Sequence, residues 1–219
     1  MNLLAQLVAI TLAQAQPTPS VTTMPARPPG LVLSILGGIG VTLGRAHSAA
    51  DVGTDALEVV SKALPVTIAI GYRFDPRWSA DLNVMYAPIV LGICGDEADA
   101  SASDIRLGAA VRWHRPTQRI VHPWISLGPG YEKFHYVGGC TDIDLTGVDL
   151  DFQVGGDIHL SASWTVGPFA SARVGTYVHM YAFPPWRGGS PSDQAISAGD
   201  LALHEWLSIG LRGTFASVP

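Results

Sequence analysis

Hydrophobic and polar residues alternate one by one along most of the chain. The stretch DIRLGAAVRWH, residues 104–114, shows the pattern: Ile105 and Leu107 share one face of an extended strand, and Arg106 and Arg112 share the other. The same period of two recurs in eight segments, which cover residues 31–43, 65–74, 78–90, 104–114, 120–134, 148–160, 165–180 and 202–215. One such segment is a weak signal, but eight in succession predict an all-β fold.

The lengths of the segments and of their connections favour a barrel that crosses a membrane. The segments have about 10 to 15 residues, whereas globular strands have about five or six and a tilted strand crosses a bilayer with roughly 9 to 11. Short connections at 75–77, 115–118 and 161–164 alternate with long ones at about 44–62, 91–103, 135–147 and 181–201. Short turns at one end and long loops at the other are typical of outer-membrane barrels.

Aromatic residues fall at the ends of these segments, where a membrane interface would place them. The predicted aromatic girdle has five members at the short-turn end and two toward the other end. They are Phe74, Trp78, Trp113, Trp164 and Phe215, and then Tyr86 and Tyr131.

The composition agrees with a membrane barrel and excludes other classes. Of the 219 residues, 47% are hydrophobic and 14% are charged, and the formal net charge is −5. The mean hydropathy is +0.26, yet no apolar run reaches the roughly 18 residues of a membrane-spanning helix. The apolar surface is therefore divided among many short segments. The absence of any basic tract argues against a nucleic-acid partner.

The N-terminus reads as a targeting segment. Residues 3–15, LLAQLVAITLAQA, are apolar and end in Ala-Gln-Ala, which predicts a secretory signal peptide at 1–15, cleaved before Gln16. A buried or amphipathic helix is the alternative, because the first seven residues contain no lysine or arginine. Residues 16–30 are rich in proline and predict an extended lead-in. The barrel domain would then occupy 31–219.

Three stretches resemble the small eight-stranded outer-membrane β-barrel proteins of Gram-negative bacteria. They are HPWISLGPGYEKF at 122–134, VGGDIHLSASWTVGPFASARVGTY at 154–177 and LSIGLRGTF at 207–215. The resemblance implies an antiparallel up-and-down transmembrane barrel, porin-like in architecture, located in the bacterial outer membrane. It also implies a monomer in contact with outer-membrane lipid and lipopolysaccharide. Family members often end on an aromatic residue associated with recognition by the barrel-assembly machinery, whereas here Phe215 is followed by ASVP.

Charged residues on the polar faces predict a network inside the barrel. An eight-stranded barrel is just wide enough for side chains to fill, and enclosed charges must pair because an unpaired one is strongly destabilising. A soluble barrel of the lipocalin kind is the alternative, with these charges outside in water. The expected lumen network consists of Arg73, Asp81, Arg106, Arg112, Glu132, Asp149, Asp151, Asp157, Arg173, Glu205 and Arg212.

The long connections carry the remaining candidate chemistry. Cys94 and Cys140 would emerge at the same end of the barrel, and export through an oxidising compartment favours a disulfide between them over two free thiols. The acidic stretch at 95–104, with Asp104 at its end, reads as a solvated surface. Divalent-cation binding is the sharper alternative, although the spacing does not match an EF-hand loop. His179 and His204 near the outer mouth give only a weak metal hypothesis.

No catalytic constellation stands out. The lipid A deacylases carry a His-x-Ser-Asn segment, and the nearest match here, YVHMYA around His179, lacks both the serine and the asparagine. We therefore expect no enzyme activity, no cofactor and no metal. The expected function is that of a structural or interaction protein, a plugged barrel that displays four extracellular loops for envelope integrity, adhesion or defence. The alternatives are a narrow channel for small or apolar solutes and, less favoured, a lipid-modifying barrel enzyme.

Overall fold

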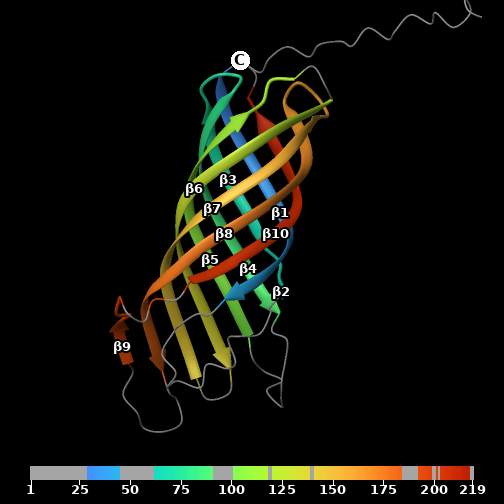
Figure 1. Ribbon diagram of the computed structural model, residues 1–219. Helices are drawn as coiled ribbons and strands as arrows, with labels where there is room; N and C mark the ends of the chain where they lie inside the picture. The colour runs from blue at the N-terminus through green and yellow to red at the C-terminus, as the bar shows by residue number, and fades with distance from the viewer. Residues whose placement is uncertain are drawn as a thin grey trace, which may run out of the picture.

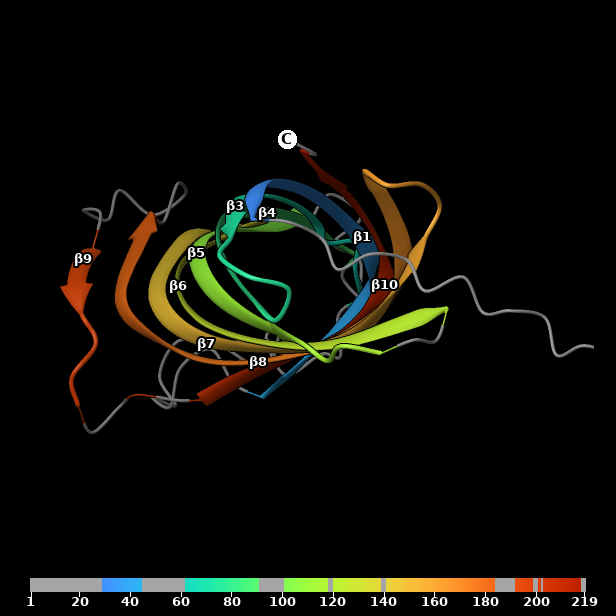
Figure 2. The same ribbon diagram turned by 90° about the horizontal axis from the view of Figure 1, so that it is seen from above.

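The computed structural model describes residues 29–44, 62–90, 101–117, 120–138, 141–183, 192–198, 201 and 203–217. These residues form one antiparallel sheet that closes into a barrel, seen from the side in Figure 1 and along its axis in Figure 2. Among the described residues, no helix is long and apolar enough to cross a membrane.

Eight strand positions make up the wall of the barrel. Seven are single long strands, and the short strands β2 and β3 together form the remaining one, between β1 and β4. The short strand β9 is added to the end of β8. The bounds are β1 Gly30–Gly44, β2 Lys62–Ala63, β3 Val66–Arg73, β4 Trp78–Val90, β5 Ser101–His114, β6 Val121–Gly138, β7 Thr141–His159, β8 Trp164–Phe183, β9 Ser192–Ala195 and β10 Leu203–Ala216.

Pairing of the first strand with the last closes the ring. β10 pairs with β1 on one side and with β8 on the other, both antiparallel. The closed ring is staggered. A line that starts at Val90 on β4 and steps from each residue to its partner on the next strand returns to β4 at Ala80, ten residues from its start (90 − 80 = 10). The line passes through Lys62, Val41, Leu207, Ala172, Phe152, Leu127 and Val111. This stagger means that the strands are tilted, as closure of a barrel requires.

The two faces of the wall have opposite character. Leu82 is 63% exposed on the outside of β4 and Leu107 is 59% exposed on β5, whereas Arg106 is 3% and Glu132 0% exposed on the inside. Apolar side chains therefore face outward and charges inward, as a bilayer requires and a soluble lipocalin-like barrel does not. The predicted eight-stranded antiparallel transmembrane barrel is confirmed.

One predicted loop is wrong. The stretch 135–147 was expected to be a long connection, but β6 continues to Gly138 and β7 begins at Thr141. His135 pairs directly with Asp144 in this extended hairpin. In Figure 1, β6, β7 and β8 accordingly reach beyond β4 at the long-loop end of the barrel. The predicted signal peptide, nearly all of the proline-rich lead-in, Cys94 and Cys140 lie outside the described residues.

Candidate functional site

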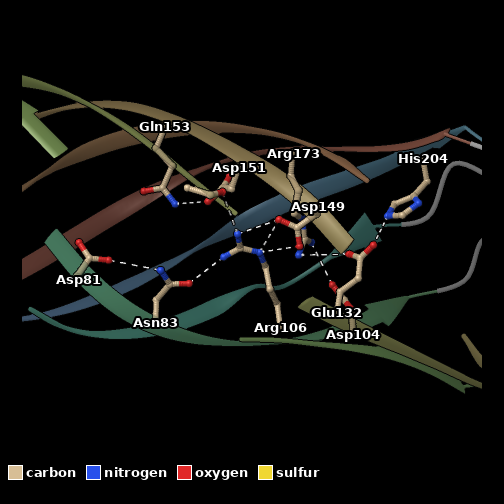
Figure 3. A network of polar contacts seen from close by, with 11 residues as sticks. Asp81, Asn83, Asp104, Arg106, Glu132, Asp149, Asp151, Gln153, Arg173 and His204 are labelled. Atoms are coloured by element: carbon tan, nitrogen blue, oxygen red, sulfur yellow. Dashed lines mark hydrogen bonds and ion pairs between the residues drawn. The ribbon is translucent and has the colours of Figure 1, made fainter. Parts of the chain in front are cut away.

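The interior of the barrel is the candidate site, and Arg106 lies at its centre (Figure 3). Arg106 Nε, on β5, donates to both carboxylate oxygens of Asp149 on β7, at 2.9 and 2.8 Å. Its Nη1 donates to Oδ1 of Asn83 on β4 at 2.8 Å. One guanidinium thus links three strands across the lumen.

Glycines make room for this guanidinium. Gly108 and Gly130 face each other across β5 and β6. A Cβ atom added at either position would collide with the Arg106 guanidinium. Their missing side chains allow the arginine to lie flat against the inner wall, since an alternating strand otherwise fills each inward position.

A second cluster lies nearer the long-loop end, around Arg173 on β8. Arg173 Nη2 donates to Asp104 Oδ2 at 3.0 Å, and its Nη1 lies 3.7 Å from Glu132 Oε2. Glu132 Oε1 also contacts His204 Nε2, and the His204 ring stacks on Tyr177 with the centroids 4.2 Å apart. Figure 3 shows Arg173 and His204 directed toward Asp104 and Glu132.

An apolar waist separates the central network from the short-turn end. Leu36, Trp124 and Phe169 form a buried cluster there, with Trp124 only 2% exposed. The guanidinium carbons of Arg112 and Arg212 lie 4.8 and 4.9 Å from the centre of the Trp124 ring. Two arginines and one indole therefore occupy the cross-section of the lumen at this level, held by cation–π contacts.

Carboxylates fix the arginines of this level. Arg112 Nη1 lies 3.1 Å from Asp81 Oδ2, and Arg212 Nη1 lies 3.5 Å from Asp157 Oδ1. The same Asp157 oxygen accepts a hydrogen bond of 3.0 Å from Trp124 Nε1. The indole is thus anchored through its ring and through its N–H group.

The long-loop end of the interior is apolar. A buried cluster there contains Phe134, Tyr136, Leu145, Met180 and Trp206 among its members. Between this cluster and the waist is a small cavity of about 40 Å³, lined in part by Arg106, Asp151 and Arg173. A space of this size holds a few water molecules at most. The described part of the lumen is therefore filled at three levels. An apolar cluster lies at the long-loop end, the charged network around Arg106 and Arg173 lies in the middle, and the waist packs Leu36, Trp124 and Phe169 together with Arg112 and Arg212.

Aromatic side chains mark two levels on the outer wall. At the short-turn end Trp78 pairs in register with Trp113, and the Trp164 and Phe215 rings are 5.1 Å apart. Phe74 is exposed at the same end, and Tyr86 and Tyr131 are exposed toward the long-loop end. An apolar belt bounded by aromatic rings is typical of a transmembrane barrel.

The comparisons with solved structures agree with this geometry. Neisserial surface protein A superposes with a TM-score of 0.51 and 14% identity, over 84% of this chain and 96% of that chain. A major outer membrane protein from Thermus thermophilus superposes with a TM-score of 0.52 and 11% identity, over 84% and 99% of the two chains. The chain has the fold of the small outer-membrane β-barrel proteins. No protein-family model and no curated protein matches the sequence.

The charged residues found inside the barrel are not all the ones that the sequence predicted. Glu205 was expected inside, but it is exposed on the outer face of β10, whereas its neighbour His204 is buried. Asp104 was expected on a solvated surface and is 0% exposed inside the barrel. The other predicted members lie on the inner face: Arg73, Asp81, Arg106, Arg112, Glu132, Asp149, Asp151, Asp157, Arg173 and Arg212. With Asp104 in place of Glu205, five arginines meet six carboxylates.

The two histidines considered as a metal pair lie on opposite sides of the barrel wall. His204 points inward to Glu132, whereas His179 lies 2.9 Å from Asp193 on the partly exposed outer side of β8 and β9. A register shift between β7 and β8 pairs Thr146 with His179 but Gly147 with Tyr177. The extra residue turns His179 outward, against the predicted alternation.

Within the part of the chain that the structure describes, one group of side chains could offer three ligand atoms to a cation, on the outer face of the β6–β7 hairpin. Ligand atoms of His135, Asp142 and Asp144 lie within 4.8 Å of one another. Lys133 Nζ is 2.9 Å from Asp144 Oδ2, and His135 Nδ1 is 2.7 Å from Asp144 Oδ1. Partial burial raises the pKa of Asp144, but the hydrogen bonds from Lys133 and His135 outweigh it and hold this pKa below its usual value.

Proposed function

We propose that the protein is a closed structural barrel of the bacterial outer membrane, which displays the long-loop end of its wall to the exterior. The observation that carries this proposal is the filling of the lumen. Arg112 and Arg212 both pack against the Trp124 ring, and the cavity on the long-loop side of this level measures only about 40 Å³. Hydrated ions need a continuous water-filled path, and these side chains interrupt it.

The extended β6–β8 wall supports a role in interaction. β8 has 20 residues, about twice the number that a tilted strand needs to cross a bilayer. Tyr181 and Phe183, near its far end, are 39% and 42% exposed. Exposed aromatic residues beyond the membrane belt favour contact with another surface. The proposed role is therefore envelope support or adhesion, without catalysis.

Planar-bilayer recording tests the closed lumen. The purified full-length chain in concentrated KCl solution should give no discrete conductance steps. The variant Trp124→Gly with Leu36→Ala, which empties the waist, should show steps if it still migrates as a folded barrel on an unheated gel. Regular steps from the wild-type protein would overturn the proposal and favour a narrow channel.

Adhesion is tested on cells that express the protein. Replacing Tyr181 and Phe183 with serine should lower attachment to surfaces or host cells while leaving the amount of folded barrel unchanged. Leu203→Ser is a matched control, because Leu203 is 66% exposed at the edge of β10. Equal attachment by wild type and the double variant would remove the support for adhesion and leave envelope support as the proposed role.

A further inference from the structure

The outer wall contains an apolar hollow that begins at a lysine. Its volume is about 810 Å³, and its lining includes Lys62, Leu64, Phe152, Ala172 and Leu207. Two other hollows on the outer wall, of about 470 and 880 Å³, have no lysine in their lining. Of these three hollows, only the one at Lys62 therefore combines an apolar surface with a lysine.

Small side chains form the floor of this hollow. Ala172 on β8 lies in register between Phe152 on β7 and Leu207 on β10. Phe152 is 46% and Leu207 44% exposed, so two large side chains stand on either side of an alanine. The wall is depressed along β8 because alanine replaces the larger residues of neighbouring lipid-facing positions.

The hollow descends from the long-loop end toward the middle of the apolar belt. The paired residues Lys62, Val41, Leu207, Ala172 and Phe152 follow one another across successive strands. With strands about 4.8 Å apart and tilted by about 40°, each step moves about 3 Å along the barrel axis. Four steps cover roughly 12 Å, which is about half of the roughly 25 Å apolar band of such barrels.

Lys62 lies where lipid headgroups are expected. On β2 it is in register with Val90 at the end of β4, four residues beyond the interfacial Tyr86. The chain has two lysines, and the other, Lys133, is held by Asp144 across the β6–β7 hairpin. Lysine side chains at this depth extend toward the interface and attract anionic headgroups.

We propose that this hollow binds an acyl chain of lipid A and that Lys62 pairs with a lipid A phosphate. A hollow that faces hydrocarbon loses contacts on one side unless a chain fills it. The phosphate-bearing lipid of the outer leaflet supplies both the chain and the anion. The assignment of the leaflet rests on the proposed function, which places the long-loop end outside; the binding itself does not depend on whether the lumen conducts.

Native mass spectrometry of the full-length protein in detergent, titrated with hexa-acylated bisphosphorylated lipid A, tests the site. Lys62→Gln should weaken the apparent affinity for lipid A about fivefold, the effect of one lysine at an anionic membrane surface. Ala172→Phe, which fills the floor, should lower it severalfold. The matched controls are Lys133→Gln for the charge and Ala109→Phe for the added ring, since Ala109 lines a hollow without a lysine.

The outcomes distinguish lipid A binding in the hollow at Lys62 from unspecific contact of lipid with the barrel wall. Lipid A without phosphates should bind wild type and Lys62→Gln equally, and all variants should keep the gel mobility of a folded barrel. Equal loss in Lys62→Gln and Lys133→Gln, or full retention in Ala172→Phe, would overturn the proposal. If lipid A does not bind in this hollow, the bilayer recordings are unaffected. The experiments therefore test the lipid A site and the closed lumen separately.

Discussion

Arg106 and Asp149 form a buried ion pair in the middle of the barrel, with Nη2 and Oδ1 2.8 Å apart and side chains only 4% and 0% exposed. Two strands that are separated by β6 contribute the partners. A buried pair adds little net stability compared with a well-packed apolar pair, but removal of one partner leaves the other charged and without access to water. The pair therefore ties the inner wall together in one register.

Arg106→Met should destabilise the barrel by about 3 to 5 kcal/mol, because Asp149 would remain as an uncompensated buried charge. Urea unfolding from lipid vesicles, followed by tryptophan fluorescence, measures the free energy of unfolding. The double variant Arg106→Met with Asp149→Leu should recover most of the loss. A double variant as unstable as the single one would contradict a stranded charge as the cause.

Leu82 tests the outer belt, since it lies on β4 midway between the aromatic residues Trp78 and Tyr86 and is 63% exposed. Leu82→Arg should cost about 2 to 4 kcal/mol by placing a charge in hydrocarbon near the midplane. Val90→Arg, on the same face at the end of β4, should cost about 0 to 1 kcal/mol near the interface. The same unfolding assay compares them, and equal costs would contradict the depth assigned to the belt.

Gly155 tests the packing of the waist. A Cβ atom at this position would collide with the Trp124 ring and lie 2.8 Å from the carbonyl oxygen of Pro168. Gly155→Ala should therefore destabilise the barrel by about 1 to 3 kcal/mol through overpacking. Gly37→Ala is the control, because nothing lies within 4 Å of its added Cβ. If both variants lost a comparable free energy of unfolding, the cause would be the backbone conformation of glycine and not a collision with Trp124.

The lowered pKa of Asp144 predicts that the stability of the end of the β6–β7 hairpin depends on pH. Because its pKa in the folded protein is lowered from 3.8, the stabilisation from this carboxylate is present above that value and is lost as pH falls through the lowered pKa. Lys133→Met should raise the pKa of Asp144, measured by carboxyl carbon NMR titration. Lys62→Met should leave it unchanged. An unchanged Asp144 titration in Lys133→Met would rule out the lysine contact as a cause.

Alternation along the chain was sufficient to predict the strands, and the lengths of the strands and of their connections favoured a barrel. Successive side chains of a strand point to opposite faces, so a period of two assigns each residue to a face without knowledge of its partners. The predicted segment 78–90 matches β4. The same rule applied throughout would have placed Asp104 with Arg106, and Glu205 with the outward Leu207. The error at Asp104 came from treating the end of a segment as loop, and the error at Glu205 came from counting it as an inward charge although it shares the face of Leu207.

The remaining features depend on contacts between distant strands. Arg106 and Asp149 are 43 residues apart, and their pairing follows from the registers of β5 with β6 and of β6 with β7. The extended β6–β7 hairpin is held by cross-strand pairs such as His135 with Asp144, while its glycine-rich tip reads as loop. The irregularity that turns His179 outward follows from the shift in pairing between β7 and β8.

The strand and loop pattern of the chain predicts a barrel with an apolar outside and a charged inside, because the face of each strand residue is a local property of the backbone. The pairing of each arginine with its carboxylate, the packing of Trp124 in the waist and the place of Lys62 on the wall come from the folded structure. These depend on strand register and barrel closure, which are set by all the strands together.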